Sequence, residues 1–228
     1  MNFKKILSLA LILVLAGSFV FAQQKSEVSV EEQYLSTIEG VIIKELTNSD
    51  SRDNKLVALQ YISDALKEKR ISPEVQYALN TLAGEGVFNP AREDGRLANN
   101  CPDIRARAAE LMAQVPTEES KDTLVKLTMG DIEPMVVTAA IRSLGEIGIN
   151  TNDDVVETIA WTEKRFSTLN PTSSLALEVL NAYEKLLPYT KDNSSLIRSI
   201  SSIAANHNYV TPVRNRALDL LKVLAAKN

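Results

Sequence analysis

Residues 133–148 read EPMVVTAAIRSLGEIG, and this stretch decides the fold. It places proline at the first helical position, apolar residues at three- and four-residue steps and glycine at the end, a pattern typical of an amphipathic helix. Related stretches are PDIRARAAELM at residues 102–112 and TPVRNRALDLL at residues 211–221. A recurring helical unit predicts a solenoid, in which each unit buries its apolar face against its neighbours.

Apolar periodicity and capping residues predict about five antiparallel helix pairs along the chain, and no strand pattern competes with them. The expected helices cover residues 30–46, 52–66, 72–84, 102–114, 117–129, 134–147, 152–166, 172–187, 193–205 and 211–226. Aligning the second helix of each pair gives equivalent starts at Arg52, Pro102, Pro134, Ser173 and Thr211.

Two positions of this alignment favour close stacking of the second helices. Six residues after each start the chain has Ala58, Ala108, Ala140, Val179 and Ala217. Ten residues after each start it has Ile62, Met112, Leu144, Tyr183 and Leu221. A small residue where two helices cross, with a large residue one turn later, is what close helix packing requires.

The second helices resemble the HEAT-repeat family, and most closely its short bacterial type. The family pattern, roughly D-P-x-V-R-x-x-A-x-x-A-L-G-x-I-G, is matched best by residues 133–148 and well by the copies at Pro102 and Thr211. The resemblance implies an all-α, right-handed α-solenoid over residues 30–228, with the second helices lining its concave face. It implies an architecture rather than an activity. It also implies that Arg105 and Arg214 bond within or between repeats.

The first 22 residues differ in composition from the rest of the chain. Two lysines precede a run of apolar residues, and small residues stand at Val20 and Ala22. This pattern predicts a signal peptide that is cleaved between Ala22 and Gln23, and therefore a periplasmic or secreted protein. The alternative is an uncleaved anchor, so membrane contact is expected only through this segment. Residues 23–29 are polar and are expected to form a flexible lead-in.

The charge balance and the rare residue types exclude several classes of function. With 29 acidic against 25 basic residues, the chain lacks the excess positive charge typical of nucleic-acid binding. Cys101 is the only cysteine, so no intramolecular disulfide can form, and a small, partly buried residue is expected there. His207 is the only histidine, whereas catalytic triads and histidine-based zinc sites need more ligands or partners. We therefore expect no enzyme activity, no catalytic residue, no metal and no cofactor.

Acidic residues cluster at two places where a helix is expected to begin. Asp153 and Asp154 form one cluster, and Glu118 and Glu119 form the other. Negative charge in a first turn stabilises the positive end of the helix dipole. Trp161 lies in a helical stretch beside apolar neighbours, so packing is the expected role of its side chain rather than sugar binding.

The stretch from residue 85 to residue 101 is the longest interruption of the helical pattern. It contains Arg92 and Arg96 together with acids, amides, glycines and proline, a composition that suits hydrogen bonding at a contact surface. We expect this irregular loop to help bind a partner. A tolerated insertion is the alternative interpretation.

These observations favour a non-catalytic scaffold that binds a protein partner along the concave face. Counting from the repeat starts, the side chains expected on that face are Arg107, Glu110, Thr138, Arg142, Asn181, Lys185, Asn215 and Asp219. Their mixed charge suits a polar protein surface more than lipid or a polyanion, although they could also be ordinary solvated sides of helices. Two other functions remain open: a structural subunit of an envelope or motility assembly, and an enzyme or enzyme accessory built on a HEAT-like scaffold.

Overall fold

The computed structural model describes residues 29–227, so the predicted signal peptide and all but the last residue of the predicted lead-in lie outside the described residues. The chain divides into two units, Met1–Thr37 and Ile38–Asn228, and the packing below concerns the second unit. The helices are α2 Val30–Thr47, α3 Arg52–Lys67, α4 Pro73–Ala83, α5 Pro102–Met112, α6 Glu118–Gly130, α7 Pro134–Ile147, α8 Asp154–Leu169, α9 Ser173–Leu186, α10 Ser194–Ala205 and α11 Thr211–Lys227, with a 3₁₀ turn at Leu187–Tyr189.

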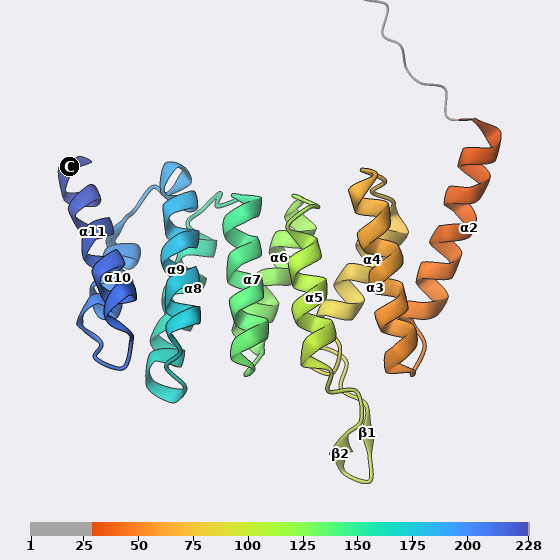
Figure 1. The fold of residues 1–228 in the computed structure, drawn as a ribbon, viewed down its shortest axis with the longest axis horizontal. Helices are drawn as coiled ribbons and strands as arrows, with labels where there is room; N and C mark the ends of the chain where they lie inside the picture. The colour runs from red at the N-terminus through yellow and green to blue at the C-terminus, as the bar shows by residue number, and fades with distance from the viewer. Residues whose placement is uncertain (1–28, 228) are drawn as a thin grey trace, which may run out of the picture. The chain divides into compact units, whose positions relative to one another are not determined.

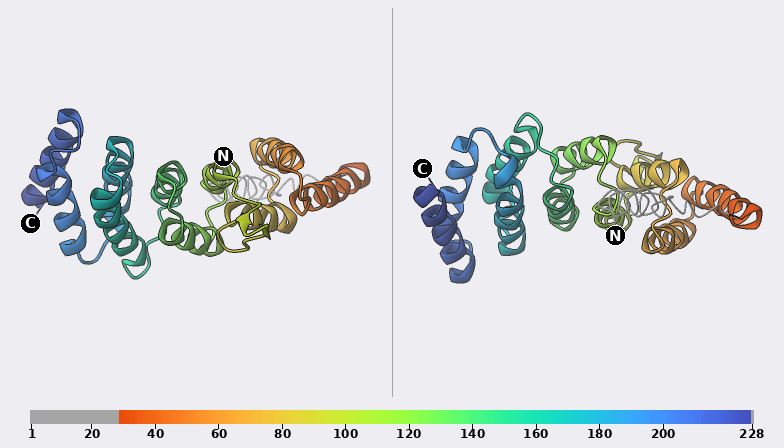
Figure 2. Two further views of the ribbon diagram at one scale, coloured as in Figure 1. Left: turned by 90° about the horizontal axis from the view of Figure 1, so that it is seen from below. Right: turned by 90° about the horizontal axis from the view of Figure 1, so that it is seen from above.

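Within the second unit the helices form two layers. The second helices of successive pairs, α3, α5, α7, α9 and α11, pack side by side in one layer (Figure 1). The first helices α4, α6, α8 and α10 pack in the other layer, which the end-on views separate from the first (Figure 2). From α4 to α11, each helix packs on its pair mate and on the equivalent helix of a neighbouring pair. The all-α solenoid predicted from the sequence is confirmed.

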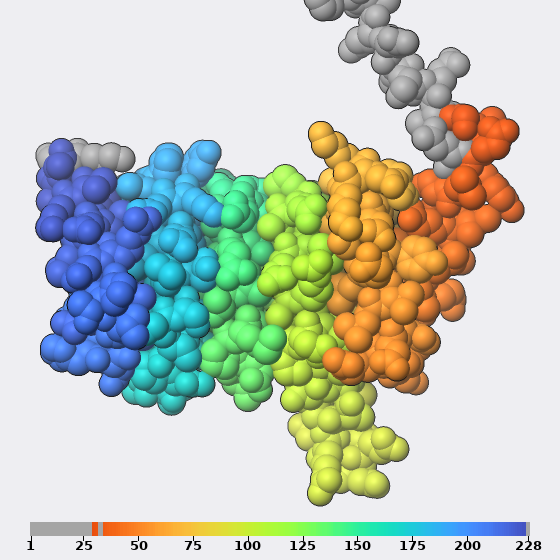
Figure 3. Space-filling model, in the orientation of Figure 1, coloured from red at the N-terminus to blue at the C-terminus, as the bar shows by residue number. Residues whose placement is uncertain are grey.

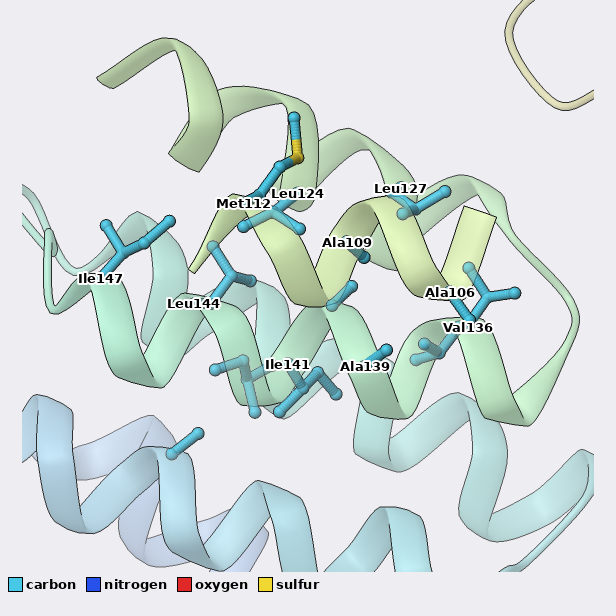
Figure 4. Packing of buried hydrophobic residues seen from close by; sticks show 14 of the residues in the cluster. Ala106, Ala109, Met112, Leu124, Leu127, Val136, Ala139, Ile141, Leu144 and Ile147 are labelled. Carbon is cyan, nitrogen blue, oxygen red and sulfur yellow. The ribbon is translucent and has the colours of Figure 1, made fainter. Parts of the chain in front are cut away.

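The core lies between these layers and follows the repeat alignment. All five residues six positions after the starts are fully buried, and the large residues ten positions after them are buried except Leu221, which is partly buried. In the central repeats, Ala106 and Ala139 allow close approach while Met112, Leu144 and Ile147 fill the space beside them (Figure 4). The core is continuous through the stack, because each buried face is completed by the neighbouring pair.

Several helices begin or end at the capping residues that the sequence predicted. Ser72 caps α4 by accepting a hydrogen bond from the Val75 N–H at 3.3 Å, and Pro73 occupies the first helical position. Gly148 ends α7 in the left-handed conformation, with φ of 70°. Gly130 was expected to be the first residue after α6. It is instead the last residue of that helix, and Asp131 is the C-cap.

Asp153 was expected in the first turn of a helix, but it is the N-cap residue of α8, one position before that turn. It adopts a left-handed conformation just before α8. Its carboxylate accepts hydrogen bonds from the backbone N–H groups of Lys191 (3.0 Å) and Asp192 (2.9 Å), between α9 and α10. These bonds lower the pKa of Asp153. The side chain therefore ties two connections between helices together, while Asp154, Glu118 and Glu119 do lie in first turns as expected.

The stretch 85–101 is not wholly irregular. It carries a short antiparallel hairpin, β1 Arg92–Glu93 and β2 Arg96–Leu97, which extends past the row of helices (Figures 1 and 3). The hairpin turns through Asp94 and Gly95, with φ of 49° and 76°. Positive φ at both central residues and the Asp-Gly sequence are typical of a type I′ turn. The expectation that no strand forms is therefore wrong at these positions.

Candidate partner-binding surface

The exposed side of the second helices, here called the second-helix face, carries all eight residues expected to line a partner-binding strip. They come from α5, α7, α9 and α11, which lie next to one another toward the viewer in Figure 3. Arg107, Arg142 and Lys185 are exposed, whereas Glu110 and Thr138 are half-buried. The strip is therefore accessible on four successive repeats.

Ion pairs join α5, α7 and α9 across this face. Arg107 pairs with Glu110 one turn along α5, at 3.1 Å. Arg142 of α7 lies 3.7 Å from Glu110 on one side and 3.0 Å from Glu178 of α9 on the other. The hydrogen bond with Glu178 raises the pKa of Arg142. Asn181 also donates to Glu178, at 3.4 Å, so the expected residues meet around a glutamate that the sequence did not single out.

Two further ion pairs continue the strip through residues that sequence reasoning missed. Lys185 of α9 pairs with Glu146 of α7, and Arg216 of α11 pairs with Glu184 of α9 at 2.5 Å. Glu146 and Lys185 occupy the same position of their repeats, twelve residues after the starts. An ion pair of this kind can be predicted from the sequence where equivalent positions of neighbouring repeats carry opposite charges.

The remaining expected residues do not join this network. Thr138 donates to the Pro134 carbonyl at 2.6 Å, inside its own helix. Asp219 pairs with Lys222 at 2.9 Å on the exposed side of α11, where Asn215 is also exposed. The structure thus brings Arg107, Glu110, Arg142, Asn181 and Lys185 into two neighbouring ion-pair groups and leaves the α11 residues apart.

A depression of about 430 Å³ lies on the second-helix face at the start of these helices. It is lined by the small side chains of Ala106, Ala139 and Ser174, and by Glu110 and Arg142. Met135 also lines the depression and is 55 % exposed. An apolar side chain framed by an ion pair is a surface that a protein partner can cover.

Arg92 and Arg96 lie on the hairpin, where both are exposed. Arg96 stands opposite Glu93 in the strand register, and Arg92 donates to the Gly95 carbonyl at 3.3 Å. Among the described residues, no hydrogen bond or ion pair links these arginines to the second-helix face. The two groups of expected partner-binding residues therefore form separate surfaces.

The hairpin is fixed at its base by a buried arginine. Arg105, only 2 % exposed, binds both carboxylate oxygens of Asp131, at 2.6 and 3.3 Å. The same guanidinium donates to the Glu85 carbonyl and to the Asn100 side chain, both at 3.1 Å, at the two ends of the loop. Arg105 thus has the structural role that was expected, and Arg214 bonds the Ala204 carbonyl within its pair at 3.3 Å.

Other contacts close the base of the hairpin. Glu85 forms a buried ion pair with Lys55 of α3 at 2.7 Å. Gly86 has a φ of 72°, and a Cβ there would lie 2.4 Å from the Asn99 carbonyl oxygen. Asn99 bonds the Ala91 N–H and the Asn89 carbonyl, each at 2.8 Å. The loop is therefore a braced projection rather than a loose insertion.

Comparison with known families agrees with this geometry. Residues 93–166 match the family model of HEAT repeats. The HEAT segment covers about a third of the chain, from β1 to α8, and the pairs on either side continue its two-layer packing. The fold is an all-α HEAT-like solenoid. Neither the curated proteins nor the solved structures contain a match.

HEAT repeats typically serve as non-enzymatic scaffolds for protein interaction. Within residues 29–227, no helix is long and apolar enough to cross a membrane. No group of three or more histidine, cysteine, aspartate or glutamate side chains in that range is placed to hold a metal ion. His207 is exposed in the turn after α10, and Cys101 is partly buried against the core.

Proposed function

We propose that this protein is an exported, non-catalytic scaffold that binds a partner protein along the second-helix face. This face corresponds to the one expected from the sequence to be concave. The observation that carries the proposal is the depression of about 430 Å³ beside the ion pair of Glu110 and Arg142, with Met135 exposed in it. A partner with one apolar side chain for the depression and polar groups for the charged strip fits this surface.

The braced hairpin is a second contact for the same partner. Its tip presents Arg92 and Arg96 in a fixed geometry, so binding does not require ordering of a flexible loop. Preorganisation of this kind lowers the entropic cost of binding.

Site-specific photo-cross-linking tests the surface. A benzoylphenylalanine replacing Ser174, at the edge of the depression, should cross-link to one protein in the native envelope. The same residue replacing Lys126, which is exposed on α6 in the other layer, is the matched control. Cross-linking of the same protein with equal yield at both positions, or only at Lys126, would contradict the proposal. Recovery of the cross-linked product in a stable large assembly would instead indicate a structural subunit.

Export is proposed from the first 22 residues, in which two lysines precede an apolar run and Ala22 stands before the expected cleavage point. The mature protein should begin at Gln23, outside the cytoplasm. An Ala22→Phe variant should keep its leader, because signal peptidase requires a small residue there. Sequencing of the N-terminus after cell fractionation checks both, and an unprocessed cytoplasmic wild-type chain would refute export.

A further inference from the structure

A groove of about 500 Å³ lies between α8 and α10, in the layer opposite the second-helix face. Larger side chains from α8 and α10 stand around it, namely Glu157, Trp161, Lys164 and Arg198. The groove exists because the side chains that face each other across the two helices are small: Ala160, Ser195, Ser199 and Ser202. These small side chains leave room in the groove for a side chain of a partner.

Glu163 lines this groove although it is only 2 % exposed. One carboxylate oxygen, Oε2, accepts a hydrogen bond from Ser199 Oγ at 3.5 Å, the long limit for such a bond. The other oxygen, Oε1, has no hydrogen-bond partner among the described residues. A buried carboxylate that lacks a donor is costly, so a ligand that supplies one would be bound favourably.

The groups packed around Glu163 do not include a cation that could neutralise it. Tyr183 of α9 and Tyr209, just before α11, lie near enough for the Glu163 charge to act on them, and Ser199 and Ser202 approach from α10. Burial raises the pKa of Glu163 to about 7, against a smaller lowering by the two serine hydroxyls. Lys164, Arg198 and Glu157 line the groove, and none of them forms an ion pair within the described part of the chain.

Trp161 supplies an apolar wall. Its side chain is about half exposed, at 49 %, rather than buried among its apolar neighbours. The Arg165 guanidinium lies 4.9 Å from the centre of its ring. An indole beside a groove can cover the methylene stem of a long side chain.

We propose that this groove binds the side chain of a lysine on a partner protein. Glu163 Oε1 is itself buried, so the Glu163 side chain turns toward the groove when the lysine enters. The lysine ammonium then donates to this oxygen, and the methylene stem lies along Trp161 and Ala160. A compact ammonium suits a single unpaired carboxylate oxygen better than the planar, multidentate guanidinium of arginine. Lys164 and Arg198 then attract acidic residues that flank the lysine. This site goes beyond the proposed function, because it lies in the other helix layer and does not depend on the second-helix face.

The only tryptophan in the sequence provides a direct reporter of this groove. In a ¹H–¹⁵N NMR spectrum, the indole N–H of Trp161 should shift on titration with Nα-acetyl-lysine amide. The same titration with Nα-acetyl-norleucine amide, which keeps the stem and lacks the ammonium, should bind at least about tenfold more weakly. Glu163→Gln should reduce lysine binding to the norleucine level, whereas Glu157→Gln should keep at least half of the wild-type affinity.

The proposal also sets a pH dependence. Because the ammonium binds the ionised carboxylate, the lysine probe should bind about tenfold more tightly at pH 8 than at pH 6. Equal binding of the lysine and norleucine probes to the wild-type protein would overturn the proposal, and so would the absence of any shift at α8 and α10. A shift caused equally by the uncharged sugar maltose would overturn it in favour of a polyol site. The lysine-to-norleucine comparison uses only wild-type protein, so it does not depend on the folding of a variant.

Discussion

At the residue scale, three buried polar groups have different consequences for the fold. Arg105 meets a full set of acceptors and braces the hairpin. Asp153 binds backbone N–H groups of the connection between α9 and α10. One carboxylate oxygen of Glu163 has no hydrogen-bond donor. Among the three groups, only the burial of Glu163 therefore has a desolvation cost that no partner offsets. Such a cost is commonly retained where it serves a binding site.

Replacement of Glu163 by glutamine should stabilise the protein at alkaline pH. The folded state holds the Glu163 proton up to about pH 7, whereas the unfolded chain releases it near the ordinary pKa of 4.5. The free energy of unfolding of the wild type therefore falls as the pH rises through this interval, in total by about 3 kcal/mol. At pH 8 we expect Glu163→Gln to be more stable by roughly 1 to 3 kcal/mol, and at pH 5 by less than about 1 kcal/mol.

Urea unfolding at the two pH values measures this difference. Glu157→Gln, at the side of the same groove, serves as the control and should leave the pH dependence unchanged. A constant difference between Glu163→Gln and the wild type at both pH values would contradict the assignment.

Two glycines of the hairpin should respond differently to alanine. Both Gly86 and Gly95 have positive φ, so each substitution strains the backbone by roughly 1 to 2 kcal/mol. At Gly95 no atom lies within 4 Å of the added Cβ, whereas at Gly86 the Asn99 carbonyl oxygen lies at 2.4 Å. Gly86→Ala should therefore destabilise the protein clearly more than Gly95→Ala. Thermal unfolding of both variants provides the comparison, and equal loss would show that the base of the hairpin is not tightly closed.

At the element scale, the helices were predictable and the hairpin was not. Pro102 and Pro134 start α5 and α7 as expected, because proline is favoured at the first helical position. The Asp94-Gly95 pair carried a hairpin signal, but strands of two residues are too short to show alternation.

The candidate sites were less predictable than the helices. Glu110 and Arg142 were expected on the second-helix face, because repeat alignment fixes which side of a helix faces the solvent. Their partner Glu178 was missed, since pairing across helices depends on how neighbouring repeats are registered. The α8–α10 groove was missed for a similar reason. Glu163 and Ser199 lie 36 residues apart, and neither is unusual within its own helix.

The hairpin should lose its order when Arg105 is replaced by methionine. The substitution leaves Asp131 buried without its cation and removes two bonds to the ends of the loop. We expect a loss of roughly 3 to 5 kcal/mol in stability. Hydrogen exchange should accelerate first in residues 85–101, while amides of α8 to α11 keep their protection. Uniform acceleration along the chain would show that Arg105 supports the whole stack instead.

At the scale of the whole molecule, the second unit is held together by contacts between neighbours. No helix pair packs on more than the pairs beside it, so stability depends on the seams between pairs. The backbones of α7 and α9 approach each other especially closely at the interface between their pairs. A Cβ on Gly145 would lie 2.9 Å from the Ala182 Cα.

Gly145→Ala should therefore destabilise the stack, although alanine normally stabilises a helix by about 1 kcal/mol relative to glycine. The added methyl group pushes α7 away from α9, which weakens the coupling between the repeats before and after this seam. We expect hydrogen exchange to report separate opening of residues 38–147 and 154–227 in the variant and concerted opening in the wild type. A variant that is more stable than the wild type, with exchange unchanged, would contradict the close seam.

The braced hairpin has a consequence for how this molecule can vary. Its foundations, Arg105, Asp131, Glu85 and Gly86, all lie outside the tip formed by Arg92 to Leu97. New sequences can therefore replace the tip without disturbing the stacked repeats. Recognition at that point can change quickly over evolutionary time while the helical body stays constant, and an experimenter can use the same freedom to graft a label or a foreign epitope there.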